Sequence, residues 1–214
     1  MKMLPVMRWM AGMAAVVLST APAWAQVDFQ KGPDNRIAIT IDGQPFSTLY
    51  LGKDFPKPFM APLMSASGEI VTRRFPMEKV EGESDDHQHH RGLFVGYGEI
   101  NGLNFWENEF KYASHAPKNF NTAKNGLIVL KSIDTMKSGK KSGELVLTID
   151  WNGPDKQTIL EEHRTMKFHG GVKDMRIMDF DFTLPRNPKQ ILRIPRRVFS
   201  RFVSPTAWRR KTAD

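Results

Sequence analysis

The side chains best able to do chemistry are concentrated in one short segment of the sequence. Asp85-Asp86-His87-Gln88-His89-His90-Arg91-Gly92 holds three of the six histidines, two carboxylates and a guanidinium. Imidazole titrates near neutral pH and is the commonest neutral metal ligand, so this mixture suits proton transfer, metal binding or recognition of a polar ligand. We predict that this histidine segment, residues 85–92, is the functional centre of the protein.

The spacing of the histidines also predicts a metal site. If the segment is a strand, His87 and His89 point to one side of it and His90 to the other, because side chains alternate along a strand. Such a pair can chelate, and Asp85 or a distant histidine could complete a mononuclear site for Zn, Cu or non-haem Fe. The distant histidines are His115, His163 and His169. A divalent metal is therefore one cofactor that the sequence allows.

Five runs of alternating apolar and polar residues predict the strands that carry this segment. They are 36–41, 127–133, 144–151, 158–168 and 175–184. Turn residues separate them, with Asp42-Gly43 after the first run, Asn152-Gly153-Pro154-Asp155 after the third and Gly170-Gly171 before the fifth. No window after residue 25 keeps a helical period. We therefore expect an all-β sandwich or supersandwich, with the histidine segment on the less regular stretch 53–126.

The first 25 residues predict a cleavable secretory signal. Lys2 and Arg8 make its start basic, residues 10–18 are apolar, and Ala23-Trp24-Ala25 has the small-x-small pattern of a cleavage site. The apolar run is shorter than the roughly 20 residues that span a bilayer, and no later segment is apolar enough to do so. We expect cleavage after Ala25 and a periplasmic or secreted domain over 26–184, which has no cysteine for disulfides.

The formal net charge of +8 belongs to the C-terminal tail. Residues 185–214 contain nine Lys or Arg and one acid, so they account for the whole net charge. The stretch 26–184 is close to neutral and offers no basic surface to a polyanion, which argues against nucleic acid as a partner.

Seven motifs between about residue 43 and residue 184 occur together in one known family. They are Lys57-Pro58-Phe59, Val71-Thr72-Arg73-Arg74-Phe75-Pro76, Asp86-His87-Gln88-His89-His90-Arg91-Gly92-Leu93, Asn101-Gly102-Leu103-Asn104-Phe105-Trp106, Glu161, Arg164-Thr165 and Asp179-Phe180-Asp181. In these motifs the chain resembles the bacterial family labelled methane oxygenase PmoA, or PmoA family protein. Gln88 departs from the proline that this family usually has between the first two histidines.

The resemblance implies a fold of the galactose mutarotase type, in which histidines and carboxylates on a concave sheet bind a sugar and move protons at its anomeric centre. It thereby implies a carbohydrate ligand. The candidate catalytic residues are then His87, His89, His90 and Glu107, with His89 or His90 as the general acid or base. The candidate substrate-binding residues are Arg73, Arg91, Trp106, Glu162 and Arg164.

Several roles within this scheme have alternatives. Either Glu107 or Glu162 supplies the partner carboxylate, and Phe105 and Trp106 either stack on a sugar ring or pack in the core. Arg164 and Asp179 could instead form a structural ion pair. The residue types favour epimerisation or elimination over hydrolysis, because no spacing places two acids as a hydrolase needs them.

Three functions follow from these residues. The first is a carbohydrate-active enzyme with acid–base chemistry at the histidine segment. The second is a metal-binding protein or oxidoreductase that uses His87 and His89. The third is a carbohydrate-binding module without turnover, which would bind a glycan and never change it.

The tail beyond residue 184 predicts an incomplete domain. Its prolines and arginines follow no strand period. Codons compatible with Arg193 to Asp214, read in another frame, permit a peptide that resembles the next segment of the family. We therefore expect a single-base insertion or deletion near 184–187, which leaves the sandwich truncated and 185–214 out of frame and disordered. The alternative is a basic extension that binds an anionic surface.

Overall fold

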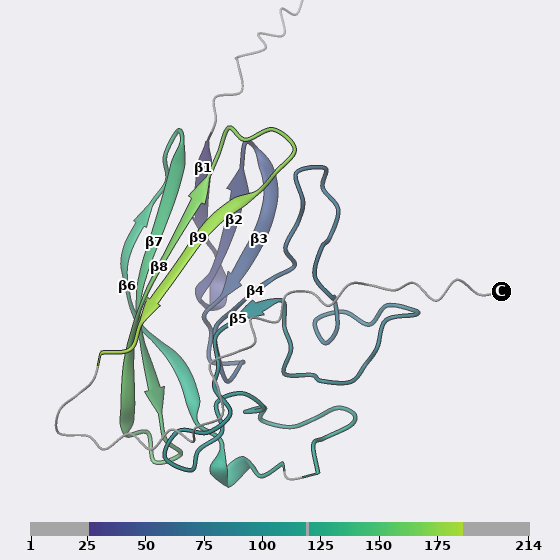
Figure 1. The fold of residues 1–214 in the computed structure, drawn as a ribbon, viewed down its shortest axis with the longest axis vertical. Helices are drawn as coiled ribbons and strands as arrows, with labels where there is room; N and C mark the ends of the chain where they lie inside the picture. The colour runs from purple at the N-terminus through teal and green to yellow at the C-terminus, as the bar shows by residue number, and fades with distance from the viewer. Residues whose placement is uncertain (1–25, 119, 186–214) are drawn as a thin grey trace, which may run out of the picture.

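Two antiparallel sheets make up the computed structural model of the chain, which describes residues 26–118 and 120–185. The predicted signal, 1–25, and the tail from residue 186 lie outside the described residues, so the cleavage site and the reading-frame change stay predictions. The first sheet has the order β1-β2-β3-β4-β5 and the second the order β6-β7-β8-β9 (Figure 1).

The first sheet consists of β1 (Val27–Lys31), β2 (Arg36–Ile41), β3 (Gln44–Tyr50), β4 (Phe59–Ala61) and β5 (Leu93–Phe94). The second consists of β6 (Leu127–Lys137), β7 (Ser142–Asn152), β8 (Thr158–His169) and β9 (Ile177–Thr183). The helices of the described residues are two 3-10 turns, η1 (Pro33–Asn35) and η2 (Thr122–Lys124). The all-β sandwich expected from the sequence is confirmed. No helix in the described ranges has the length and apolar character to cross a membrane.

All five predicted strands are present, and the turns between them lie where the turn residues predicted. Asp42 and Gly43 both have positive φ, at 54° and 76°, and join β2 to β3 as a two-residue hairpin. The strands that the sequence did not predict are β1, β3, β4 and β5. Pro45 and a register shift interrupt the pattern of β3, and β4 and β5 are too short to show a period.

The core lies between the two sheets. Alternate residues of β7 and β8 point inward, and Leu145, Leu147 and Phe168 are fully buried. The Phe168 ring makes edge contacts with Phe29 of β1 and Phe46 of β3, at centroid distances of 5.6 and 5.9 Å. Aromatic contacts therefore join the two sheets across the sandwich.

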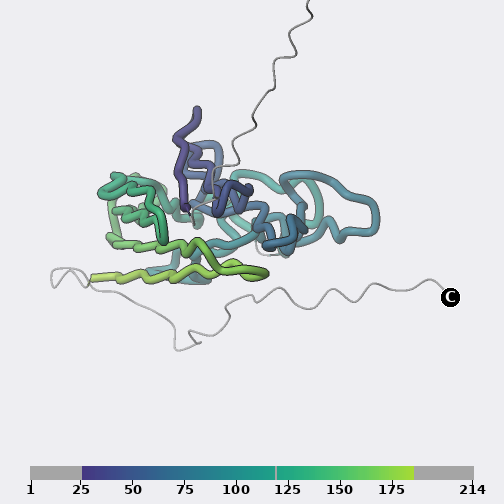
Figure 2. The backbone as a smooth tube through the Cα atoms, turned by 90° about the horizontal axis from the view of Figure 1, so that it is seen from above, coloured from purple at the N-terminus to yellow at the C-terminus, as the bar shows by residue number. Residues whose placement is uncertain are grey.

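The segment between β3 and β6, residues 51–126, has little regular structure apart from β4, β5 and η2. Figure 2 shows its blue and teal loops extending to one side of the two sheets. Long segments with so little secondary structure are uncommon in small domains and are usually functional loops or linkers. The histidine segment lies in this loop region, as the sequence predicted.

We predict that Phe168→Ala lowers the free energy of unfolding by about 3–5 kcal/mol, because it opens a cavity where the two sheets meet. Phe110→Ala is the control, since that ring is 50% exposed and its loss leaves no cavity. Urea denaturation of the two variants measures the difference. Equal losses would mean that Phe168 does not join the sheets.

Candidate functional site

The histidine segment forms a turn and not a strand. The His90 N–H donates to the His87 carbonyl oxygen at 2.9 Å, and His87 has a left-handed backbone with φ 47°. The prediction that His87 and His89 share one side of a strand, with His90 on the other, is therefore wrong. The turn nevertheless brings all three rings together: His87 and His90 stack at 5.1 Å, and His89 meets His90 edge-on at 4.2 Å.

Two residues of the segment fix this turn in place. The Gln88 side-chain amide donates to the Lys111 carbonyl oxygen at 2.9 Å, and its Oε1 accepts from the Ala113 N–H at 2.7 Å. Gly92 has φ 58°, and a Cβ at this position would overlap the Met60 carbonyl oxygen. Gln88 thus ties the histidine turn to a neighbouring loop through two hydrogen bonds.

Aromatic rings form the wall beside the histidines. Trp106 lies 5.6 Å from the His90 ring and Phe94 of β5 lies 6.0 Å from it, and these two rings are themselves 5.1 Å apart. Trp106 is partly exposed, as a ligand platform requires. Phe105 is fully buried and packs on Trp151 at 5.0 Å. Of the two readings for Phe105, core packing is correct and stacking on a sugar is wrong.

Burial sets the protonation of the two inner histidines. Desolvation, and after it the nearby His90 and Lys57, lower the pKa of His89 to about 2. Desolvation, followed by His87, lowers the pKa of His90 to about 4. The Tyr112 hydroxyl lies 2.9 Å from His89 Nδ1, and burial raises its pKa, so it stays protonated. Both imidazoles are neutral at pH 7, and because burial disfavours their charged forms, both are weaker bases than a free imidazole.

Beneath the histidines lies an ion pair that is nearly inaccessible to water. Arg91 Nη1 and Nη2 both donate to the Glu109 carboxylate, and the two side chains are 7% and 3% exposed. The guanidinium also lies over the Phe55 and Phe59 rings, at 5.3 and 5.7 Å. Both Nη atoms of Arg91 are therefore engaged inside the protein, which leaves the anchoring of a substrate oxygen to other residues.

Lys57 is a member of this site to which the sequence assigned no role. Its Nζ donates to the Trp106 carbonyl oxygen and to Asn108 Oδ1, each at 2.6 Å, and the residue is 3% exposed. Desolvation lowers the pKa of Lys57 to about 7, against the opposing effect of Glu109. The signal that could have found it is the position between Pro56 and Pro58 in an apolar stretch, where the chain leaves a lysine little access to water.

The rim of the site is polar. His87 Nδ1 lies 2.9 Å from Asp86 Oδ2, and Arg73 donates to the backbone carbonyls of Ser84 and Asp86 at 2.7 and 2.9 Å. The Ser84 hydroxyl, and then His87, hold the pKa of Asp86 below its usual value. After desolvation and His87, the positive charge of Arg73 also lowers the pKa of His90. Arg73 is therefore the predicted binding residue best placed to meet a ligand over the histidines.

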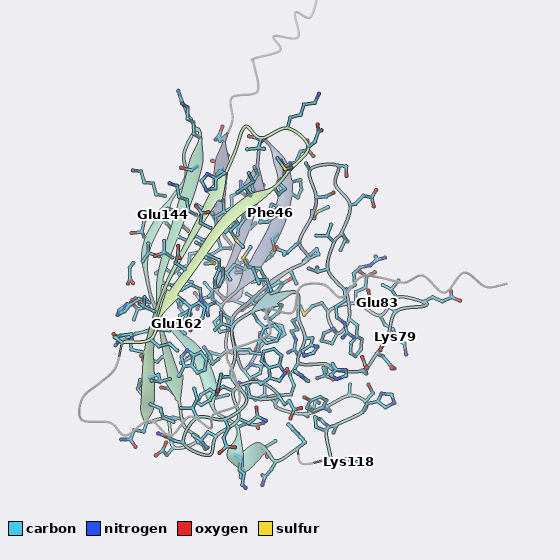
Figure 3. The ribbon with its side chains drawn as sticks, viewed as in Figure 1. Phe46, Lys79, Glu83, Lys118, Glu144 and Glu162 are labelled. Atoms are coloured by element: carbon cyan, nitrogen blue, oxygen red, sulfur yellow. The ribbon has the colours of Figure 1, made fainter. Side chains whose placement is uncertain are left out.

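The two candidate partner carboxylates lie in different parts of the molecule. Glu107 is half-buried next to Trp106, and its charge acts on Lys57 and Tyr112. Glu162 is fully buried in β8, where it accepts from Trp151 Nε1 at 2.8 Å and from Arg164 Nε at 2.7 Å. Figure 3 shows Glu162 on the second sheet, across the molecule from Glu83, which precedes the histidine turn by a few residues. The structure thus places Glu107 in the loop region near Lys57 and Tyr112, and Glu162 and Arg164 in the core.

The metal hypothesis gains no support from the donor positions. Within residues 26–118 and 120–185, no three His, Cys, Asp or Glu side chains are arranged to hold a metal ion. His163 lies 3.3 Å from Glu161, and His169 lies 2.8 Å from Asp179, so both contact carboxylates of the second sheet, away from the histidine turn. His115 lies 3.6 Å from Asp85 with its side chain 68% exposed.

A cavity of about 610 Å³ lies elsewhere, where β8 turns into β9. Its lining consists of Lys141, His169, Gly170, Gly171, Val172, Ile177 and Asp179. None of these residues belongs to the histidine turn or its aromatic wall. We take the turn as the candidate site because it combines neutral imidazoles, a buried amine and a partly exposed indole.

A family model matches residues 36–202, described as a family of unknown function (DUF6807). The chain belongs to this family. The match includes the whole candidate site of this DUF6807 member and continues beyond residue 184, where the strand pattern of the sequence ends. No curated protein and no solved structure matched the chain. The resemblance to the PmoA-labelled family stays a prediction.

We predict that Glu109→Gln lowers the free energy of unfolding by about 3 kcal/mol or more, because it leaves the Arg91 charge buried without a counter-charge. The matched control is Glu78→Gln, which removes an exposed pair with Arg74 and should cost under about 1 kcal/mol. Urea denaturation at pH 7 compares them. If Glu109→Gln proved as mild as its control, the buried pair of Arg91 and Glu109 would not stabilise the fold.

The pKa of Lys57 predicts a pH dependence of stability. Between pH 7 and the ordinary lysine pKa of 10.5 the unfolded chain binds more protons than the folded one, so the free energy of unfolding rises with pH. From pH 7 to 9 this contribution is on the order of 2 kcal/mol. Relative to Lys57→Met, the natural protein should therefore gain that much stability over this range in urea titrations. Lys53→Met, which changes an exposed lysine, should follow the natural protein.

Proposed function

We propose that the protein is a carbohydrate-active enzyme whose histidine turn removes or returns a proton at a sugar carbon. The observation that carries this proposal is the contact of three imidazoles with one another and with the Phe94 and Trp106 rings. Aromatic faces suit the apolar face of a sugar ring, and neutral imidazole is the commonest general base of enzymes. The resemblance to the PmoA-labelled family and its mutarotase-like fold gives further support.

His90 is the base in this proposal. It is partly exposed, its pKa is lowered to about 4, and its buried Nε2 has no hydrogen-bond partner among the described residues. His89 is almost fully buried and engaged with Tyr112, so it supports the turn from within. Arg73 and the exposed His87 then meet the oxygen atoms of the sugar at the rim, with Trp106 beneath the ring.

The two carboxylates of a hydrolase have weaker support. Glu109 is held by Arg91 with both oxygens, and Asp86, the acid in contact with the turn, is bound to His87 and to the Ser84 hydroxyl. Paired-carboxylate hydrolysis needs two acids on either side of the scissile bond. We therefore favour epimerisation or elimination. We also propose that the enzyme acts after export, because residues 1–25 have the pattern of a secretory signal.

Deuterium exchange tests this function directly. The purified protein is incubated in D₂O with a panel of mono- and oligosaccharides, and ¹H NMR follows carbon-bound protons and new double bonds. We expect at least one sugar to exchange or eliminate, and His90→Gln to slow it at least about 100-fold. The rate should fall as the pH drops through about 4, because the base is then protonated.

His163→Gln is the matched control, since that side chain is 48% exposed on the second sheet and should leave the rate unchanged. A sugar that raises the melting temperature and never exchanges would replace the enzyme with a binding module. A panel that neither binds nor exchanges would refute the carbohydrate proposal.

A further inference from the structure

Arg73 has hydrogen-bond donors at the rim of the histidine turn that the protein itself does not use. Its Nη2 donates to the Ser84 and Asp86 carbonyl oxygens at 2.7 and 2.9 Å. Its Nη1 lies 3.8 Å from Asp86 Oδ1, which is too long for a hydrogen bond. A guanidinium has five N–H groups, so the three on Nη1 and Nε have no hydrogen-bond partner among the described residues. The side chain is 20% exposed, and neither nitrogen is enclosed by the protein.

A short chain of contacts joins this cation to the proposed base. Asp86 Oδ2 lies 2.9 Å from His87 Nδ1, and the His87 ring stacks on the His90 ring at 5.1 Å. Arg73 therefore lies one carboxylate and one imidazole away from His90. A ligand group that binds to the guanidinium is held close to the position where a proton is removed.

The other charged groups near the turn also suit an anion. Lys57 Nζ bonds two neutral oxygens, so its ammonium form has no bonded counter-charge, whereas Arg91 is balanced by Glu109. Asp86 opposes an anion, but it accepts from the Ser84 hydroxyl at 2.6 Å and contacts His87. An anionic group at the rim thus approaches two cations and one acid that already has partners.

The proposed proton transfer requires a sugar carbon with an acidic C–H bond. A carbon whose neighbours carry only hydroxyl or ether oxygens does not lose a proton to imidazole, because nothing delocalises the electron pair that remains. Two kinds of sugar have an activated C–H bond. One has a free carbonyl group, and the other is a uronic acid, in which a carboxylate is attached to C5.

We propose that the substrate of the histidine turn is a uronic acid or a glycan that contains one, with its carboxylate on Arg73 and its C5–H bond facing His90. This inference rests on the proposed function, whose substrate class it names. The carboxylate takes up the electron pair of the broken C–H bond, and a fixed cation stabilises the second negative charge that develops there. A sugar with a neutral carbonyl group would use less of this positive charge.

The step balances in atoms and charge. The C5–H electron pair moves into the carboxylate to form an enediolate, and His90 takes the proton and becomes an imidazolium. In D₂O the imidazolium exchanges its proton and returns deuterium to C5. In a 4-linked glycan the C4–O bond breaks instead, the electron pair forms a C4–C5 double bond, and the leaving oxygen takes the proton from His90.

Matched pairs of sugars test the inference. Isothermal titration calorimetry compares the methyl glycosides of glucuronic, galacturonic and mannuronic acid with those of glucose, galactose and mannose, so that each pair differs in a carboxylate against a hydroxymethyl group. We expect at least one acid to bind about tenfold more tightly than its neutral parent, and this preference to shrink in about 0.5 M NaCl. In D₂O, ¹H NMR should show that the same acid loses its H5 signal.

Variants of the rim locate the preference. Arg73→Gln should abolish it, whereas Arg74→Gln should keep it, because Arg74 pairs with the exposed Glu78 at 3.4 Å. Asp86→Asn removes the opposing charge and should tighten the binding of the acid. This variant keeps the test decisive if Arg73→Gln does not fold.

Acids that bind no more tightly than their neutral parents, in the natural protein and in Asp86→Asn, would overturn the inference. Exchange of a neutral sugar with no exchange of any acid would also overturn it and leave the proposed function standing. An acid that binds through Arg73 and never exchanges would support the acidic ligand and remove the proposed enzyme.

Discussion

The buried ion pair between Arg91 and Glu109 is the constraint on which the site depends. Removing two charges from water costs several kcal/mol per ion, and only excellent geometry offsets this cost. Here both Nη atoms meet the carboxylate, and the guanidinium lies over two aromatic rings. Arg91 follows directly after the histidines, and Glu109 ends the stretch that contains Trp106. The pair therefore holds the histidine turn against its aromatic wall.

Around this pair, side-chain hydrogen bonds satisfy backbone groups that strand pairing satisfies elsewhere in the fold. Asn108 accepts from Lys57 and donates to the Gly126 carbonyl oxygen at 2.8 Å, just before β6 begins. Asn125 donates to the Glu109 carbonyl oxygen at 2.9 Å. Buried backbone carbonyls need partners, and a loop has no neighbouring strand to supply them. A long irregular segment is stable here because buried amide and amine groups satisfy its backbone.

The sequence predicted the strands well where one face of a strand is buried, and poorly where long-range contacts decide the structure. The alternation in 158–168 matches the burial of β8, where every second residue from Leu160 to Phe168 is buried. The run 127–133 placed β6 correctly, although Ile128 is its one fully buried residue. The prediction that His87 and His89 point to the same side was wrong. Side chains alternate in direction only along a strand, and His87 lies in a turn with a left-handed backbone. Phe105 was ambiguous for a similar reason, since an aromatic residue suits a core and a ligand platform equally.

Lys57 and Glu109 show a further limit of sequence reading. Nothing local distinguishes Glu109 from Glu107 two residues before it, because the difference lies in Arg91, which reaches one of them from another loop. Lysine is almost never fully buried, so Lys57 would ordinarily be placed on the surface. Its position between prolines is a weak signal, and the two acceptors that make burial tolerable belong to residues about fifty positions later. The sequence therefore predicted the histidines from their residue type. It did not predict the buried charged groups beside them, because distant residues bury those groups.

The charges around the turn restrict the chemistry that it can perform. Desolvation keeps His89 and His90 neutral, and Tyr112 keeps its proton, so the interior of the site has bases and hydrogen-bond donors without a strong resident acid. Both oxygens of Glu109 are occupied by Arg91, so this carboxylate does not face the turn. Lys57 is the group whose pKa, about 7, lets it hold or release a proton under neutral conditions. In the proposed reaction, a proton taken by His90 is held only briefly, because desolvation disfavours the imidazolium, and this favours reactions that return the proton to the same substrate over reactions that consume one.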